Sequence, residues 1–227
     1  IGIKSALVER FDELKDVLVQ MEDRITRKRR NTPSGDKEHV IVVGGCGTNS
    51  VEVFNWSKKS WPPLQSMPKQ RWGATAFLYK NHLITAGGSS DLGIDYLNDM
   101  IKMNVDSNHD LSTHWSDCPV KLPSGLAFHS SVVYNDLIVS GGRTKFLGAV
   151  SDCIHEVQLV PPFNTKFLSR MPEPRLGHGM EIFNDKLLIV GGTTTGNCQN
   201  SLSSVILYDI KKKEWKQLAS LPYEVSN

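Results

Sequence analysis

The amino-acid sequence predicts an all-β fold of short, repeated sheets, and three observations lead to this prediction. An apolar run ends in a glycine pair four times in the 227 residues, as HVIVVGG, LITAGG, LIVSGG and LLIVGG. The first glycines of these pairs, Gly44, Gly87, Gly141 and Gly191, are 43, 54 and 50 residues apart. Similar segments surround each pair in the same order. A period near 50 residues indicates repeated supersecondary units.

Each unit holds the segments of four strands. An apolar stretch and a tight turn, such as Asn135-Asp136, precede the glycine run, and a second apolar run such as VILYDI (205–210) follows the glycine loop. A bulky aromatic residue and a Leu-Pro or Met-Pro dipeptide close the unit. Runs of about four to eight residues rich in Val, Ile, Tyr and Phe are typical of strands. Because a single four-stranded sheet cannot bury both faces, the units are expected to pack side by side as a β-propeller.

These segments resemble the repeats of the Kelch family over about residues 39–222. The resemblance rests on the glycine pairs, on Tyr208-Asp209 followed by Trp215, and on the Arg-x-Gly openings Arg71-Trp72-Gly73 and Arg175-Leu176-Gly177. It implies a Kelch-type β-propeller, and propellers of this family usually close with about six blades. We therefore expect about four blades of a larger ring.

Two repeats depart from the pattern. Repeat 1 has only its later three strands, and repeat 3 has Leu126 and Phe128 where Arg and Gly are expected. Residues 223–227 stand where a fifth repeat would begin. The alternative is a closed ring of four blades in which residues 223–227 form the closing strand. The predicted propeller spans residues 39–227, with blades at about 39–68, 71–123, 125–172 and 175–222.

A different pattern precedes the repeats. Large apolar residues of segment 1–30 are spaced by 4, 3, 4, 3 and 4 positions: Leu7, Phe11, Leu14, Leu18, Met21 and Ile25. This spacing predicts an amphipathic, coiled-coil-like N-terminal helix. Two alternatives are open for it: docking on the propeller, or homo-oligomerisation. Residues 31–38, with Pro33, Ser34 and Gly35, form the predicted linker.

Charge and cysteine usage limit the function classes. The chain has 26 Lys and Arg against 24 Asp and Glu, of which segment 1–30 holds eight and six, so the propeller segment is formally neutral. A neutral body argues against nucleic-acid binding. No apolar run is long enough for a membrane span. Four cysteines without a C-x-x-C pair indicate free thiols in a reducing, cytoplasmic location, and the basic cluster Arg24–Arg30 leaves a nuclear location open.

The sequence contains no catalytic motif. It has no Gly-rich phosphate loop, no H-E-x-x-H and no nucleophile elbow, so we predict no enzyme activity, no cofactor and no metal. His129 and His178 recur at the same position of repeats 3 and 4. This recurrence favours a structural role at the start of an inner strand.

The remaining route to function is a surface. The loops before the first strand and after the second strand of every blade emerge on one face, and such loops commonly carry binding sites. Arginine forks suit the carboxylates of an acidic peptide. The resemblance to Kelch-like ubiquitin-ligase adaptors implies that arginines of the Arg-x-Gly openings contact acidic substrate peptides. The predicted partner contacts are Arg71, Trp72, Arg143, Phe146 and Arg175.

We therefore predict a non-enzymatic module that binds a protein partner, as the substrate-recognition part of a ubiquitin-ligase complex. An actin-binding cytoskeletal scaffold is the alternative function, and a Kelch-like enzyme is a more distant one. An alternative also exists for individual residues. Arg71 and Arg175 could bridge neighbouring blades, and Trp72 could pack between blades instead of facing a partner.

Overall fold

The computed structural model describes residues 40–90, 95–105, 114–196 and 200–226. Its strands are β1 (Ile41–Gly45), β2 (Thr48–Val53), β3 (Thr75–Tyr79), β4 (His82–Ala86), β5 (Ser89–Ser90), β6 (Asp95–Tyr96), β7 (Met100–Asn104), β8 (Ser116–Asp117), β9 (Ser130–Tyr134), β10 (Asp136–Ser140), β11 (Cys153–Val157), β12 (Thr165–Arg170), β13 (Gly179–Phe183), β14 (Lys186–Val190), β15 (Val205–Asp209) and β16 (Glu214–Gln217).

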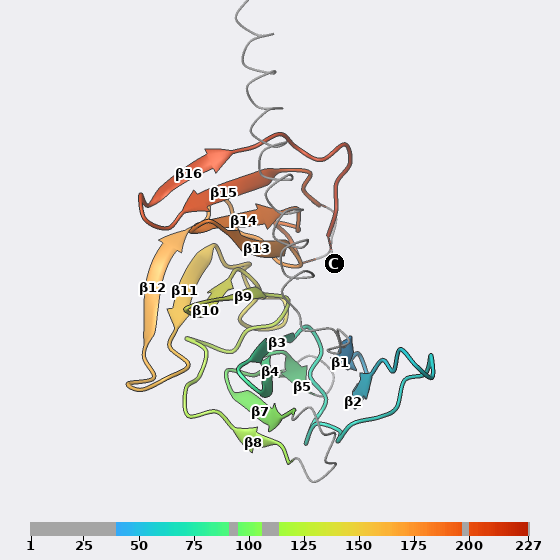
Figure 1. Ribbon diagram of the computed structural model, residues 1–227. Coiled ribbons are helices and arrows are strands. Elements are labelled where there is room, and N and C mark those ends of the chain that lie inside the picture. Colours follow the sequence, from blue (N-terminus) through green and yellow to red (C-terminus); the bar gives the residue numbers. More distant parts are fainter. Residues whose placement is uncertain (1–39, 91–94, 106–113, 197–199, 227) are drawn as a thin grey trace, which may run out of the picture.

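Three antiparallel, four-stranded sheets form the body of the molecule. Their strand orders are β3-β4-β7-β8, β9-β10-β11-β12 and β13-β14-β15-β16. The first strand β9 lies beside both β3 and β13. Figure 1 shows these first strands toward the middle, with β8, β12 and β16 at the rim. This is the arrangement of propeller blades, and we refer to the three sheets as blades 2, 3 and 4.

The predicted fold class needs one correction. The described residues form an all-β, Kelch-type propeller and contain no helix, so the structure does not support the N-terminal helix that we predicted as part of this fold. The segment on which that prediction falls, residues 1–30, lies outside the described residues.

Blade 1 is incomplete within the described residues. Strand β1 pairs with β2 alone, whereas the corresponding strands β4, β10 and β14 are each flanked on both sides. The outer segment 60–63 stays irregular: Val53 donates to the carbonyl of Pro62, and Glu52 forms a single bridge with Pro63. Proline has no N–H to give to a ladder, which explains why this edge forms no regular strand.

The core lies between the blades and is built by the alternation of side chains along the strands. In β4, Ile84 and Ala86 pack toward blade 3, while Leu83 joins a cluster with Val51 of blade 1. The middle strands of each blade are therefore apolar on both faces and read as continuous runs in the sequence. The same alternation in β10 divides residues between two clusters: Leu137 and Val139 on one side, Ile138 on the other.

The hairpin turns that join the first and second strands carry the residues that such turns require. Asn184 and Asp185, between β13 and β14, have φ angles of 45° and 61°. Positive φ at both central residues matches the twist of a two-residue hairpin, and Asn and Asp tolerate it better than most residues. These turns lie at the opposite end of the blades from the glycine pairs.

Candidate functional site

The glycine pairs of blades 2, 3 and 4 each bond to the chain segment that follows the blade. The N–H groups of Gly88, Gly142 and Gly192 donate to the carbonyls of Leu126, Arg175 and Val225, at 2.8 Å in each case. The preceding glycine has a φ near +60° and lies against the same carbonyl; at Gly87 a Cβ atom would stand 2.5 Å from the oxygen of Leu126. Only glycine permits this close approach of two backbones.

Short bridges beside the glycine pairs hold the loops in place. Backbone bridges join Trp72 to Ser89, Ala127 to Arg143 and Leu176 to Thr193, so each link between blades pairs with the loop that follows a glycine pair. The loops and links therefore lie at one end of the blades. We call this end the loop face: links 71–73, 126–128, 175–177 and 222–226 with loops 143–150 and 193–196.

Two predicted partner contacts, Arg71 and Arg175, are buried inside their own blades. Arg71 is 2% exposed, donates to the carbonyl of Gly87 at 2.9 Å and forms an ion pair of 2.9 Å with Asp99. Its counterpart Arg175 is 0% exposed. Both guanidinium groups are thus engaged at the strand ends of their own blades, which favours a structural role for them, and their assignment as partner contacts stays a prediction.

Arg143, a third predicted contact, is also covered. It is only 7% exposed, and its guanidinium occupies the space that Gly196 leaves by having no side chain. Its backbone forms bridges with both Ala127 and Val150. Arg143 therefore joins loop 143–150 to loop 193–196 and offers little charge to a ligand.

The two predicted aromatic contacts are accessible. Trp72 is 42% exposed, and its ring meets Phe128 edge to face with centroids 5.0 Å apart. Phe146 is 55% exposed, and its neighbour Leu147, which our sequence analysis did not include, is 80% exposed. The sequence signal that could have identified Phe146 and Leu147 together is the presence of two adjacent large apolar residues in a predicted loop. Tyr223, in the last link, is 69% exposed.

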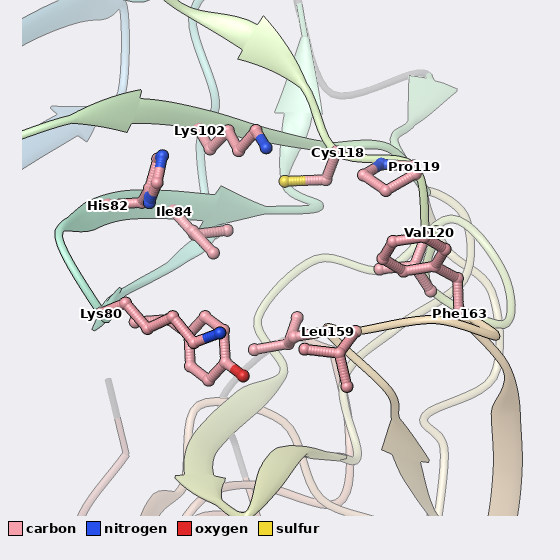
Figure 2. Close-up of a pocket in the computed structure, with 11 residues that line it drawn as sticks. Lys80, His82, Ile84, Lys102, Cys118, Pro119, Val120, Leu159 and Phe163 are labelled. Carbon is pink, nitrogen blue, oxygen red and sulfur yellow. The ribbon is translucent and has the colours of Figure 1, made fainter.

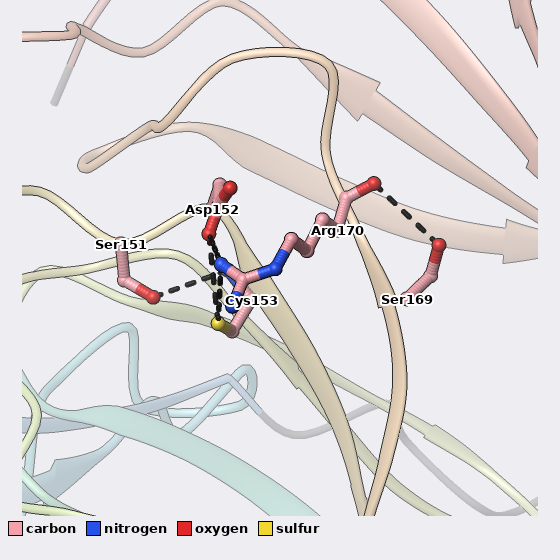
Figure 3. A network of polar contacts seen from close by, with 5 residues as sticks. All are labelled: Ser151, Asp152, Cys153, Ser169 and Arg170. Atoms are coloured by element: carbon pink, nitrogen blue, oxygen red, sulfur yellow. Dashed lines mark hydrogen bonds and ion pairs between the residues drawn. The ribbon is translucent and has the colours of Figure 1, made fainter.

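Blade 3 lacks the buried arginine of blades 2 and 4, and a different arginine forms an ion pair near its strand ends. Leu126 stands where blades 2 and 4 have Arg71 and Arg175, and it packs into the core between blades 2 and 3. A different arginine, Arg170 of β12, donates to Asp152 at 2.6 Å and lies 3.5 Å from the Cys153 sulfur (Figure 3). This guanidinium is largely exposed, so it restores an ion pair near the strand end but not a buried one.

The repeated histidines connect neighbouring blades. His129 Nε2 lies 3.2 Å from the hydroxyl of Thr75 in blade 2, and His178 Nε2 lies 2.7 Å from that of Ser140 in blade 3. Burial lowers the pKa of His129 to about 4; burial, with smaller effects from Arg175 and His129, lowers the pKa of His178 to about 3. Both imidazoles are therefore neutral near pH 7. A structural role agrees with this geometry.

The described ranges contain no group of three or more His, Cys, Asp or Glu side chains suited to a metal ion. Nor do these residues include a helix long and apolar enough to cross a membrane.

The comparisons with known proteins agree with the repeat geometry. The pattern of the KLHDC2/KLHL20/DRC7 Kelch-repeats domain matches residues 31–222. The chain belongs to the Kelch-repeat family. Proteins of this family bind protein partners and are generally non-enzymatic, which supports a protein-interaction module.

Individual relatives are similar at modest identity. Kelch-like protein terF of Aspergillus terreus is 26% identical over 195 residues, which cover 78% of this chain and 41% of the relative. Kelch-like protein 7 of Rattus norvegicus is 41% identical over 56 residues, which cover 25% of this chain and 9% of the relative. The chain thus spans less than half the length of these Kelch-like proteins.

Two solved structures share the fold. The structure of YjhT has a TM-score of 0.69 and 18% identity, covering 84% of this chain and 66% of its own. A copper-bound fungal alcohol oxidase has a TM-score of 0.56 and 14% identity, covering 82% of this chain and 52% of its own. At these identities the likeness establishes the propeller fold alone.

Proposed function

We propose that this Kelch-repeat domain binds its partner protein through apolar side chains of the loop face. The observation that carries the proposal is the exposure of Phe146 and Leu147, at 55% and 80%, at the tip of loop 143–150. Aromatic residues such as Phe are enriched at protein interfaces, where a few well-buried side chains carry most of the binding free energy.

The backbone of the loop presents these side chains rigidly. Both ends are fixed, because Arg143 is bridged to Ala127 and to Val150. The tip is closed by a hydrogen bond of 3.0 Å from the Gly148 N–H to the Lys145 carbonyl, and Leu147 has a φ of 55°. Large residues rarely adopt this left-handed conformation, and strain of this type is concentrated at functional sites.

Other exposed aromatic residues extend the proposed surface. Trp72 and Tyr223 belong to links at the same end of the blades, and aromatic residues are enriched at the centres of protein interfaces. The side chains of Arg71, Arg143 and Arg175 are buried. The loop face therefore does not expose the guanidinium groups that were predicted to bind an acidic peptide. The proposed anchor is therefore apolar.

The wider role we propose is the substrate-recognition part of a ubiquitin-ligase complex. Its support is the family membership together with a loop face that offers a surface for docking. In that role the apolar side chains of loop 143–150 would select the substrate.

Crosslinking and substitution test the loop face together. A photoreactive p-benzoylphenylalanine placed at Phe146 in the full chain is expected to capture a protein partner, whereas the same group at Phe167 is not. Phe167 is a matched control because it is 51% exposed but lies on the rim strand β12.

We expect the double substitution Phe146→Ala with Leu147→Ala to weaken binding of the captured partner by about tenfold or more, since each removes an apolar contact. Thermal unfolding should be unchanged, because both side chains are exposed. Equal weakening by Phe167→Ala, or unchanged affinity of the double variant, would contradict the proposal.

A further inference from the structure

A pocket of about 190 Å³ lies between blades 2 and 3, away from the loop face. Its walls come from the turn that joins β3 to β4, from β7, from residues 118–120, and from the loop that joins β11 to β12. Because β4 runs from His82 toward the glycine pair, the pocket lies toward the opposite end of the blades. In Figure 2, Lys102 and Cys118 line one side of the pocket and Lys80 lies on the other, with Leu159 between Lys80 and Phe163.

The apolar part of the pocket is preformed. Ile84 and Val120 are each 4% exposed and belong to the core, against which Leu159 and Phe163 pack. Backbone hydrogen bonds fix the loop at both Leu159 and Phe163. The Leu159 N–H donates to the carboxylate of Asp136 at 3.2 Å, and the Phe163 N–H donates to the Val160 carbonyl at 2.9 Å. A ligand would therefore meet a rigid apolar wall.

The charged part of the pocket has one sign. The charged lining residues are Lys80 and Lys102, and no carboxylate is among the residues that line the pocket. The Lys80 amino group lies 5.3 Å from the centre of the Tyr79 ring, where the ring face favours a cation but leaves it accessible to water. Burial raises the pKa of the Cys118 thiol to about 11, so this group is neutral near pH 7 and supplies no compensating charge.

The volume limits the kind of ligand. Sites for cofactors and drug-sized molecules commonly measure about 300–1,000 Å³, whereas this pocket has room for one large apolar side chain. Amino groups at its margin favour carboxylates beside that side chain, and ion pairs at an interface add specificity and speed association.

We propose that this pocket receives a single Leu, Met or Phe side chain from an acidic segment of a partner protein, whose carboxylates pair with Lys80 and Lys102. The site is a second contact surface, separate from the loop face. It does not depend on the contacts assigned to Phe146 and Leu147.

Selection from a displayed library of random peptides, with the full chain as bait, tests this proposal. We expect selected peptides to share one large apolar residue flanked by Asp or Glu. The double substitution Lys80→Glu with Lys102→Glu should weaken their binding by about tenfold or more, because it replaces attraction by repulsion. Lys212→Glu is the matched control, since Lys212 is an exposed lysine in the turn between β15 and β16 of blade 4.

Further measurements separate the pocket from the loop face. All variants are checked by thermal unfolding, and the milder pair Lys80→Gln with Lys102→Gln should give an intermediate loss. The peptides should bind the Phe146→Ala, Leu147→Ala variant as they bind the unaltered chain. The proposal is overturned if selection gives no acidic consensus, if the charge-reversed variant retains the affinity, or if only peptides dependent on Phe146 and Leu147 emerge.

Discussion

Replacing Arg175 with alanine is expected to lower the free energy of unfolding by about 3–5 kcal/mol, because it removes one partner of a buried, charged network. The guanidinium is fully buried and donates to the Gly191 carbonyl at 2.8 Å, to the Ser204 hydroxyl at 2.7 Å and to Glu173 at 2.7 Å. After the substitution, the carbonyl would be left without this donor. Since the Glu173 side chain is 39% exposed and can regain water, the lower end of the range is expected. Urea denaturation measures the change.

Arg170→Ala is the matched control for this experiment. Arg170 also pairs with a carboxylate, that of Asp152, but its side chain is 64% exposed. Exposed ion pairs are screened by water and contribute about 1 kcal/mol or less. If Arg175→Ala costs no more than Arg170→Ala, the guanidinium of Arg175 does not hold the strand ends of blade 4 as the structure indicates.

The sheets could be predicted because short-range patterns determine them. Apolar residues on both faces of the middle strands, turn residues such as Asn184-Asp185, and the glycine pairs all act within a few positions of the chain. The burial of the arginines depends instead on carbonyls that folding brings near. The sequence did contain a signal for it. Arg71 and Arg175 each stand 16 positions before the glycine whose carbonyl they bind, and such recurrence favours a structural role.

One alternative for Arg71 and Arg175 was that they bridge neighbouring blades. The structure shows a structural role for them, but their contacts lie within one blade. Arg71 binds Gly87 and Asp99, which belong to the same blade. The backbone of the glycine pairs makes the bridges between blades instead. Phe128 is also informative, because it adopts a φ of 57° where Gly73 and Gly177 stand in blades 2 and 4. The fold of the neighbouring repeats imposes this conformation, which no local pattern predicts.

The pocket between blades 2 and 3 could not be predicted from the sequence. Its walls come from four parts of the chain that are separated in the sequence: residues 79–84, Lys102, residues 118–120 and residues 159–163. None of them carries a motif, and their lysines resemble ordinary surface residues. The pairing of β4 with β7 brings Lys80 and Lys102 to the same side of blade 2, and the packing of blade 3 adds the apolar wall of Leu159 and Phe163. Leu147 was missed for a related reason, since its exposure follows from the backbone conformation at the loop tip.

Acid is expected to destabilise the propeller well above the pH at which carboxylates titrate. Burial lowers the pKa of His129 to about 4 and that of His178 to about 3, from an ordinary value of 6.5. Above about pH 6.5 both histidines are neutral in the folded and the unfolded chain, so their protonation does not alter stability. As the pH falls below 6.5, the unfolded chain takes up protons that the folded chain cannot, and stability decreases until the folded pKa values are passed.

The expected loss is about 3 kcal/mol for the two histidines together between about pH 7.5 and about pH 5.5. The physical reason is that each Nε2 has one hydroxyl partner from a neighbouring blade, while each Nδ1 is buried without a partner in the described structure. An imidazolium would bury a second, unpaired donor together with its charge.

Urea denaturation at a series of pH values measures this loss. The double substitution His129→Gln with His178→Gln should flatten the decrease, because glutamine can contact the hydroxyls and does not titrate. His114→Gln, at an exposed histidine, should leave the slope unchanged. If the double variant loses stability as steeply as the unaltered chain, other groups cause the acid sensitivity. If the free energy of unfolding of the double variant depends less on pH, the acid sensitivity arises at the contacts between blades, where His129 reaches Thr75 and His178 reaches Ser140.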